Sequence, residues 1–105
     1  MKAQVINSFG DPSVFTLADM PIPEVIPGHV LIKVHATSVN PIDYKVRSGA
    51  VAAIAPEFPA ILHGDVAGTV EAIGDSVVNF KKGDEIYGCA GGFRGLGGAL
   101  AEYML

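Results

Sequence analysis

The chain is short of several features that point to particular protein classes. It has 105 residues and a single cysteine, Cys89, so an internal disulfide is excluded and a reducing compartment is expected. No run approaches the roughly 18 uninterrupted apolar residues that a membrane helix needs. Alternating residues follow Lys2, where a secretion signal would have an apolar core. We therefore expect one cytoplasmic domain without a membrane partner.

Charge, and positive charge above all, is also scarce. Seven lysines and arginines stand against 11 aspartates and glutamates, which gives a net charge of −4. Because nucleic-acid-binding domains carry a basic surface, we expect no nucleic-acid partner. Charged residues make up 17% of the chain and hydrophobic residues 50%, whereas about 25% charged is usual for soluble domains. We expect part of this apolar excess to face a missing domain or partner.

Metal-ligating side chains are few and scattered. A catalytic zinc takes three protein ligands, commonly His, Cys or carboxylate, and an open position. The chain offers one cysteine and three histidines without tight spacing. The pair of His63 and Asp65 is the nearest approach to a ligand set, and a histidine bonded to backbone at a strand entry explains His63 more simply. We expect no metal site, and we expect Cys89 to be a buried small hydrophobe.

Glycines between Pro59 and Gly88 give the strongest structural signal. Gly-Asp pairs recur there at positions 64–65, 74–75 and 83–84, between short β-rich runs. Glycine adopts backbone angles that other residues avoid, so this punctuation predicts turns and tight corners. Gly68 lies inside an apolar run, which predicts a bulge. The pattern indicates a mainly β fold whose sheet bends sharply, as in a small barrel.

Runs of β-forming residues give the expected strands. Within the clearest run, Ile32 and Val34 fall on one face and Lys33 and His35 on the other, which is the period of a strand with one buried face. Residues 50–60 are expected to be irregular with one loose turn, and the glycine-rich residues 91–98 to be a loop. The expected strands are Lys2–Ile6, Val14–Met20, Val30–Val39, Val66–Ile73 and Glu85–Cys89, followed by an apolar run from Leu100 to Leu105.

One short helix is predicted after the strand that ends at Val39. Asn40 suits the N-cap, Pro41 the first helical position, and Asp43 places negative charge at the positive end of the helix. The helix is expected to end near Ser48–Gly49. Asn40 therefore lies at a corner of the chain, where functional residues concentrate.

Four stretches, in this order, resemble one family: MKAQVINSFGDP, SVNPIDYKVRSG, FPAILHGDVAGTVEAIGDSV, and NFKKGDEIYG followed by GGALAEYML. They resemble the N-terminal catalytic domain of the medium-chain dehydrogenase/reductase superfamily, whose fold is similar to the co-chaperonin GroES. The resemblance implies a GroES-like catalytic domain over residues 1–105, a partly open β-barrel with one or two short helices. The family's Rossmann domain is absent, and the abrupt apolar end suggests a piece of a longer protein.

Within that superfamily the chain resembles the zinc-free quinone oxidoreductase and enone reductase branch. Zinc alcohol dehydrogenases carry a cysteine where this chain has Asn40, and their zinc histidine falls on Gly64. The resemblance implies hydride transfer from NADPH, without zinc, to a small quinone or α,β-unsaturated carbonyl. It implies the Rossmann domain of the same protein as a partner, and it allows a homodimer. Without that domain, we expect the chain alone to give little or no turnover.

The resemblance places the candidate catalytic residues at the start of the helix: Asn40, Asp43, Tyr44 and Lys45. Asn40 matches a residue that lies near the nicotinamide, so it is also the candidate for cofactor binding. Conjugate reduction leaves an enolate oxyanion, which Lys45 or Tyr44 can stabilise and protonate, as can solvent. Many quinone reductases have tyrosine where Lys45 stands, so the proton donor is left open. Helix capping, packing and a solvated charge are the structural alternatives.

Two other functions stay open at this point. The length and the fold fit a non-enzymatic GroES-like binding module such as a co-chaperonin subunit, although the long mobile loop of co-chaperonins corresponds to a short, proline-stiffened segment here. A fragment of a zinc alcohol dehydrogenase is the other alternative, and it lacks the ligands expected at Asn40 and Gly64.

Overall fold

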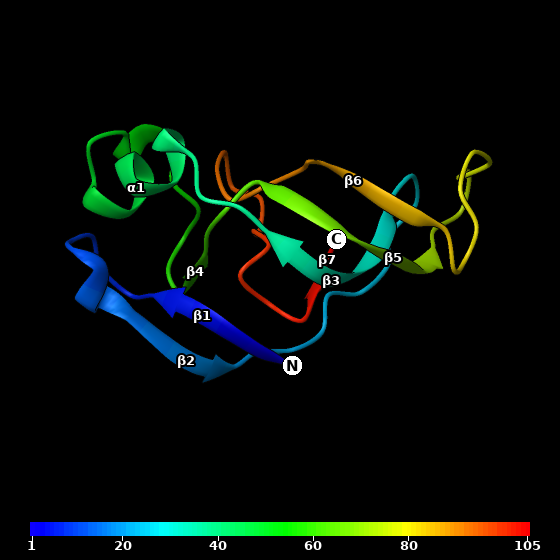
Figure 1. Ribbon diagram of the computed structural model, residues 1–105, viewed down its shortest axis with the longest axis horizontal. Helices are drawn as coiled ribbons and strands as arrows, with labels where there is room; N and C mark the ends of the chain where they lie inside the picture. Colours follow the sequence, from blue (N-terminus) through cyan, green and yellow to red (C-terminus); the bar gives the residue numbers. More distant parts are fainter.

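Two antiparallel sheets and one α-helix make up the fold (Figure 1). The computed structural model describes all residues from Met1 to Leu105. The predicted mainly β, partly open barrel is confirmed, because the two sheets do not close on each other. In chain order the elements are β1 (Lys2–Ile6), the 3₁₀ turn η1 (Pro12–Val14), β2 (Phe15–Asp19), β3 (Val30–Thr37), α1 (Pro41–Ser48), the 3₁₀ turn η2 (Ala52–Ile54), β4 (Ala60–Ile61), β5 (Asp65–Ile73), β6 (Glu85–Cys89) and β7 (Tyr103–Met104).

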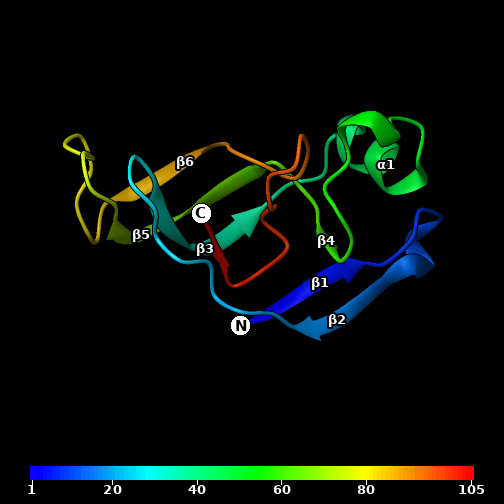
Figure 2. The ribbon, with the colours of Figure 1, turned by 180° about the vertical axis from the view of Figure 1, so that it is seen from behind.

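The C-terminal segment ties the two sheets together. The first sheet has the order β2-β1-β4 and the second β6-β5-β3-β7. From the first sheet, the Gln4 N–H donates to the Leu100 carbonyl at 2.8 Å, and from the second, the Val34 N–H donates to the Glu102 carbonyl at 2.9 Å. Seen from behind, this segment runs between β1 and β3 (Figure 2). The sheets therefore keep a fixed relation while the barrel stays open.

Each sheet has its own apolar core. The first cluster joins β1, β4 and α1, and Val46 is the buried residue that α1 contributes to it. In the second cluster Met104, on β7, packs with residues of β3 and β5. Burying a side chain of this size contributes about 1.5–3 kcal/mol. Val46 thus anchors the helix and, with it, the corner that precedes the helix. The clusters are Ile6, Val46, Ala60 and Leu62, and Ile32, Val66, Ala99 and Met104.

The bulge predicted inside the strand at Gly68 lies instead in the neighbouring strand. The ladder between β3 and β5 shifts register twice: His35 is the extra residue on β3 opposite Gly68 and Ala67, and Glu71 is an extra residue on β5 opposite Leu31 and Ile32. Gly68 allows the two backbones to approach, because a Cβ there would lie 2.1 Å from the Lys33 carbonyl oxygen. The predicted alternation of β3 holds for Ile32 and Val34, which are buried or half-buried, against the exposed Lys33 and His35, and it ends at the bulge at His35.

Several element boundaries differ from the predicted ones. Val14 belongs to η1 and not to a strand, because the Asp11 carboxylate caps that turn by accepting the Ser13 N–H at 2.9 Å. β3 ends at Thr37, before the predicted Val39. Only Tyr103–Met104 of the last apolar run forms a strand.

The segment over residues 50–60 contains the expected loose turn, η2, but also part of an unpredicted strand, β4, that pairs with β1. The predicted helix is confirmed as α1, with Gly49 at φ 88° as its C-cap. No helix of the structure combines the length and the apolar character needed to cross a membrane.

Candidate functional site

Asn40 and Asp43 begin α1 as the sequence predicts. Asn40 is the N-cap and Pro41 follows it, and the Asp43 carboxylate accepts a hydrogen bond from the Asn40 backbone N–H at 2.7 Å in a capping box. Asp43 is only 3% exposed. A buried carboxylate on the first turn satisfies an otherwise unpaired amide and suits the positive end of the helix. A hydrogen bond to a buried carboxylate therefore holds the corner between β3 and α1.

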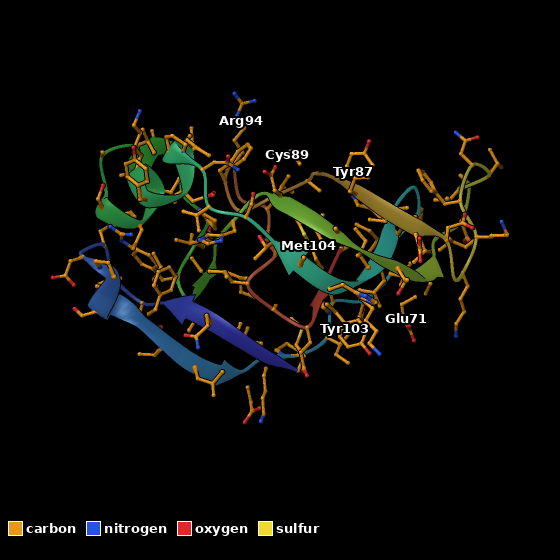
Figure 3. The ribbon with its side chains drawn as sticks, viewed as in Figure 1. Glu71, Tyr87, Cys89, Arg94, Tyr103 and Met104 are labelled. Atoms are coloured by element: carbon orange, nitrogen blue, oxygen red, sulfur yellow. The ribbon has the colours of Figure 1, made fainter.

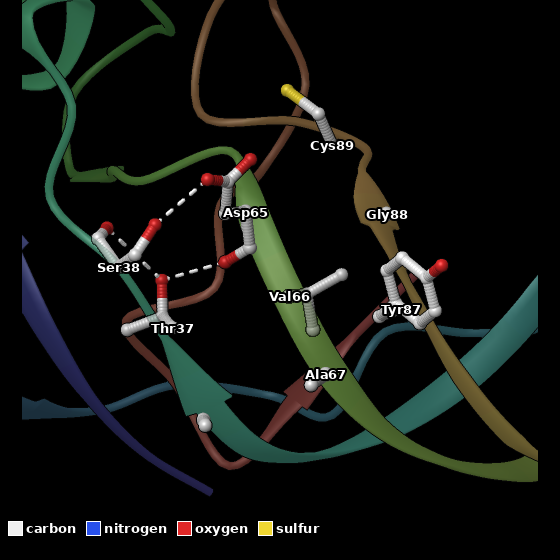
Figure 4. A pocket seen from close by; sticks show the side chains of 9 residues that line it. Thr37, Ser38, Asp65, Val66, Ala67, Tyr87, Gly88 and Cys89 are labelled. Atoms are coloured by element: carbon white, nitrogen blue, oxygen red, sulfur yellow. Dashed lines mark hydrogen bonds between the residues drawn. The ribbon is translucent and has the colours of Figure 1, made fainter.

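The carboxylate of Asp65 gathers the other polar side chains of this corner. Asp65 opens β5, beside the end of β3. Its Oδ2 accepts hydrogen bonds from the Ser38 hydroxyl and from Asn40 Nδ2, both at 2.7 Å. Its main-chain carbonyl accepts the Thr37 hydroxyl at 2.7 Å (Figure 4). The bonds from Ser38 and then Asn40 hold the pKa of Asp65 below its ordinary value, so the carboxylate is charged at neutral pH.

A groove of about 470 Å³ opens beside this corner, and its volume falls in the range of small-molecule sites. The polar groups stand at one side, where β3 ends and β5 begins, and β6 forms the other side (Figure 4). The lining residues are Ala36, Thr37, Ser38, Asp65, Val66, Ala67, Tyr87, Gly88 and Cys89. The groove therefore combines an apolar floor with a few convergent polar groups.

Two side chains of β6 face solvent at the groove. Tyr87 is 89% exposed. Cys89 is exposed as well, which corrects the expectation of a buried hydrophobe, because β6 is an edge strand whose outer side nothing covers (Figure 3). Partial desolvation and the negative charge of Asp65 raise the pKa of the Cys89 thiol, which is therefore protonated at neutral pH.

His63, two residues before Asp65 in the chain, is buried in an unusual backbone conformation. Its backbone φ is 74°, its side chain is 8% exposed, and its Nδ1 has no hydrogen-bond partner. The expected backbone bond is thus missing at Nδ1. Burial lowers the pKa of His63, while the charge of Asp43 acts in the opposite direction. The imidazole is therefore neutral at neutral pH.

The structure separates the sequence-predicted residues into two groups. Asn40 reaches the groove edge through Asp65, and Asp43 supports it from the helix. Tyr44 is 46% exposed and Lys45 is exposed, and neither lines the groove. Their catalytic roles, like that of Asn40, stay predictions.

Sequence reasoning missed Ser38 and Tyr87 and considered Asp65 only as a metal ligand. A signal that could have found Ser38 is its place at the corner of the chain, between the predicted strand and the helix start at Asn40. The signal for Asp65 was a charged residue directly after Gly64 at the entry to a β-rich run. In the structure no three His, Cys, Asp or Glu side chains gather closely enough to hold a metal ion.

Comparison with known proteins identifies the fold family. Residues 26–105 match the model of the alcohol dehydrogenase GroES-like domain. The chain belongs to this family. A quinone oxidoreductase of Sus scrofa is 43% identical to the GroES-like domain over 108 residues, covering 100% of this chain and 31% of that protein. The predicted membership of the medium-chain dehydrogenase/reductase superfamily, on its quinone oxidoreductase side, is confirmed.

Solved structures agree with this assignment. The quinone oxidoreductase of Coxiella burnetii matches with a TM-score of 0.87 and 40% identity, over 99% of this chain and 33% of that one. A mycobacterial protein solved in complex with NADPH matches with a TM-score of 0.85 and 33% identity, over 99% of this chain and 30% of that one. The GroES-like domain thus spans about a third of the length of the proteins that it matches.

Proposed function

We propose that this domain is the substrate side of an NADPH-dependent reductase of quinones or α,β-unsaturated carbonyls. The observation that supports the proposal most is the polar corner at Asn40, which opens on a small-molecule groove in a chain whose relatives are quinone oxidoreductases. The Rossmann domain of the longer protein would hold most of the cofactor. The isolated domain would then be inactive.

The corner suits the nicotinamide end of NADPH better than its phosphates. Asp65 brings a negative charge to the groove edge, which repels phosphate, whereas Asn40 and Ser38 offer neutral polar atoms. NADPH would supply the hydride, and the protein would supply position and electrostatics. In this proposal Asn40 binds the nicotinamide portion, and the apolar floor of Val66 and Ala67 holds a flat ring.

Hydride addition leaves negative charge on the carbonyl oxygen of the substrate, and that charge has to be stabilised. We propose Tyr44 or Lys45 for this role, with solvent as the alternative proton source. In the full-length protein, Lys45→Met and Tyr44→Phe separate these options. The variant that lacks the stabilising group should lose at least about tenfold in kcat, and unchanged kcat in both would assign the proton to solvent.

The remaining parts of the proposal concern metal, assembly and location. We propose chemistry without zinc, because Asn40 and Gly64 stand where the zinc enzymes carry ligands. Stoichiometric zinc by metal analysis of the purified protein would contradict this.

We also propose a homodimer, which light scattering would detect. A cytoplasmic location completes the proposal, although two of the matched relatives are named as chloroplast proteins.

The deciding experiment is steady-state NADPH oxidation by the full-length protein with 1,2-naphthoquinone and with 2-cyclohexen-1-one. Ethanol with NADP⁺ is the control for alcohol dehydrogenase activity. Turnover with the quinone or the enone, and none with ethanol, is the expected result. If NADPH reduced neither acceptor, the proposed function would be rejected, and a sevenfold ring in light scattering would favour a co-chaperonin-like module.

A further inference from the structure

The side-chain polar hydrogens at the end of β3 are all directed to acceptors within the protein. The Thr37 hydroxyl donates to the Asp65 carbonyl, and the Ser38 hydroxyl donates to the Asp65 carboxylate. The Asn40 carboxamide has two N–H bonds, of which one points to Asp65 at 2.7 Å and the other toward the Ser38 oxygen at 3.4 Å. An ionised carboxylate has no hydrogen to donate. The side chains of Thr37, Ser38, Asn40 and Asp65, here called the acceptor edge, therefore retain only lone pairs for a ligand.

Asp65 also fixes which way the Asn40 carboxamide is turned. A carboxylate can only accept hydrogen bonds, so the nitrogen of Asn40 must face it, and a flipped amide would place the carbonyl oxygen against a negative charge. The same carboxylate holds the Ser38 hydroxyl hydrogen. Because of Asp65, the Asn40 carboxamide and the Ser38 hydroxyl present lone pairs, and not hydrogens, to a ligand.

We propose that Asp65 is a positioning residue that makes the acceptor edge selective for hydrogen-bond donors of the nucleotide cofactor. The suitable donors are a hydroxyl of the nicotinamide ribose or the NH₂ of the nicotinamide carboxamide. The carbonyl oxygen of a quinone or enone does not bind there, because two acceptors would face each other. The oxyanion is stabilised elsewhere in the cleft. This inference rests on the proposed function and adds to it the division of the groove between cofactor and substrate.

Asp65→Asn in the full-length protein tests the proposal, because it preserves shape while allowing the neighbouring amide and hydroxyl to reorient. The dissociation constant of NADPH, measured by nucleotide fluorescence, should rise on the order of tenfold. The KM for the quinone should change less than about twofold. Asp19→Asn, which removes an exposed carboxylate from β2, is the matched control and should change neither value.

A double-mutant cycle separates positioning from a general loss of structure. If Asp65 acts through Asn40, Asn40→Ala combined with Asp65→Asn should weaken NADPH binding no more than the stronger single variant. Additive effects, an unchanged NADPH dissociation constant in Asp65→Asn, or a rise in quinone KM alone would each overturn the proposal. If the wild-type protein does not bind NADPH, the proposed function and this inference fail together, whereas normal wild-type binding with an unaffected Asp65→Asn rejects only the inference.

A measurement on the wild-type protein keeps the test independent of variant folding. Two cofactor analogues each lack one donor: the 3-acetylpyridine analogue replaces the carboxamide NH₂ with methyl, and the other lacks the 2′-hydroxyl of the nicotinamide ribose. At least one of them should bind on the order of tenfold more weakly than the parent cofactor. Equal binding of both analogues and the parent would contradict a donor-selective edge.

Discussion

At the residue scale, His63 is the clearest case of a group whose protonation state the fold decides. It is buried, its Nδ1 has no partner, and burial lowers its pKa despite the nearby charge of Asp43. The unfolded chain takes up a proton at this histidine as the pH falls through about 6.5, while the folded chain resists it. The contribution of His63 to the free energy of unfolding is therefore fully present above that pH and is lost progressively as the pH falls below it.

We therefore predict that the domain loses stability between pH 7.5 and pH 5.5, in part through His63. In His63→Asn, which keeps a residue that tolerates positive φ, the fall in unfolding free energy over this interval should be smaller. Urea unfolding at both pH values measures the difference. His35→Asn at an exposed position is the control, and an equal pH dependence in His63→Asn and wild type would refute the prediction.

Cys89 gives a second prediction at the residue scale. The negative charge of Asp65 contributes to the raised pKa of the thiol, so removing that charge should increase the thiolate fraction at a given pH. Alkylation by iodoacetamide at pH 8 should be roughly several-fold faster in Asp65→Asn than in wild type. Mass spectrometry of the modified cysteine gives the rate. A rate equal to wild type would show that Asp65 does not influence the thiol.

At the scale of elements, local signals predicted what short stretches of chain decide. The helix over Pro41–Ser48 follows from the Asn-Pro-x-Asp start and the glycine stop, and the structure confirms it. β4 was missed because its two residues become a strand only by pairing with β1. The Asp65 contacts were missed for the same reason, since they join residues 25 and 27 positions apart across the register of β3 and β5.

Gly68 shows how that register depends on one residue. We predict that Gly68→Ala destabilises the domain by about 1–3 kcal/mol, because the added methyl group would meet the Lys33 carbonyl and push β3 away from β5. Chemical denaturation measures the change. Gly88→Ala on β6 is the matched control, because nothing lies within 4 Å of a Cβ built there. Equal stabilities of the two variants would contradict the close approach.

At the scale of the whole molecule, the domain is elongated, 39 × 23 × 21 Å, and its groove stands at an uncovered edge strand. Large apolar side chains are exposed in this region: Tyr87, which lines the groove, is 89% exposed, and Val39, which follows the lining residue Ser38 in the chain, is 69% exposed. The composition predicted this excess of apolar residues, but only the folded structure shows where on the surface they lie. A surface of this kind fits a cleft that a further domain would complete.

For the same reason we predict that the isolated 105-residue domain does not oxidise NADPH above the blank rate with a quinone acceptor, whereas the full-length protein does. Absorbance at the NADPH band, at matched molar concentration, gives the comparison. Circular dichroism of the isolated domain has to show its strands, so that inactivity is not mistaken for unfolding. Clear turnover by the isolated domain would mean that no further domain is needed for cofactor binding.

The most direct measurement is a crystal structure of the full-length protein with NADPH. The account predicts that the nicotinamide end of the cofactor lies in the groove beside β6, with one of its N–H or O–H donors within hydrogen-bond distance of Asn40, Ser38 or Asp65. A nicotinamide bound on another face of the domain, away from this corner, would contradict it.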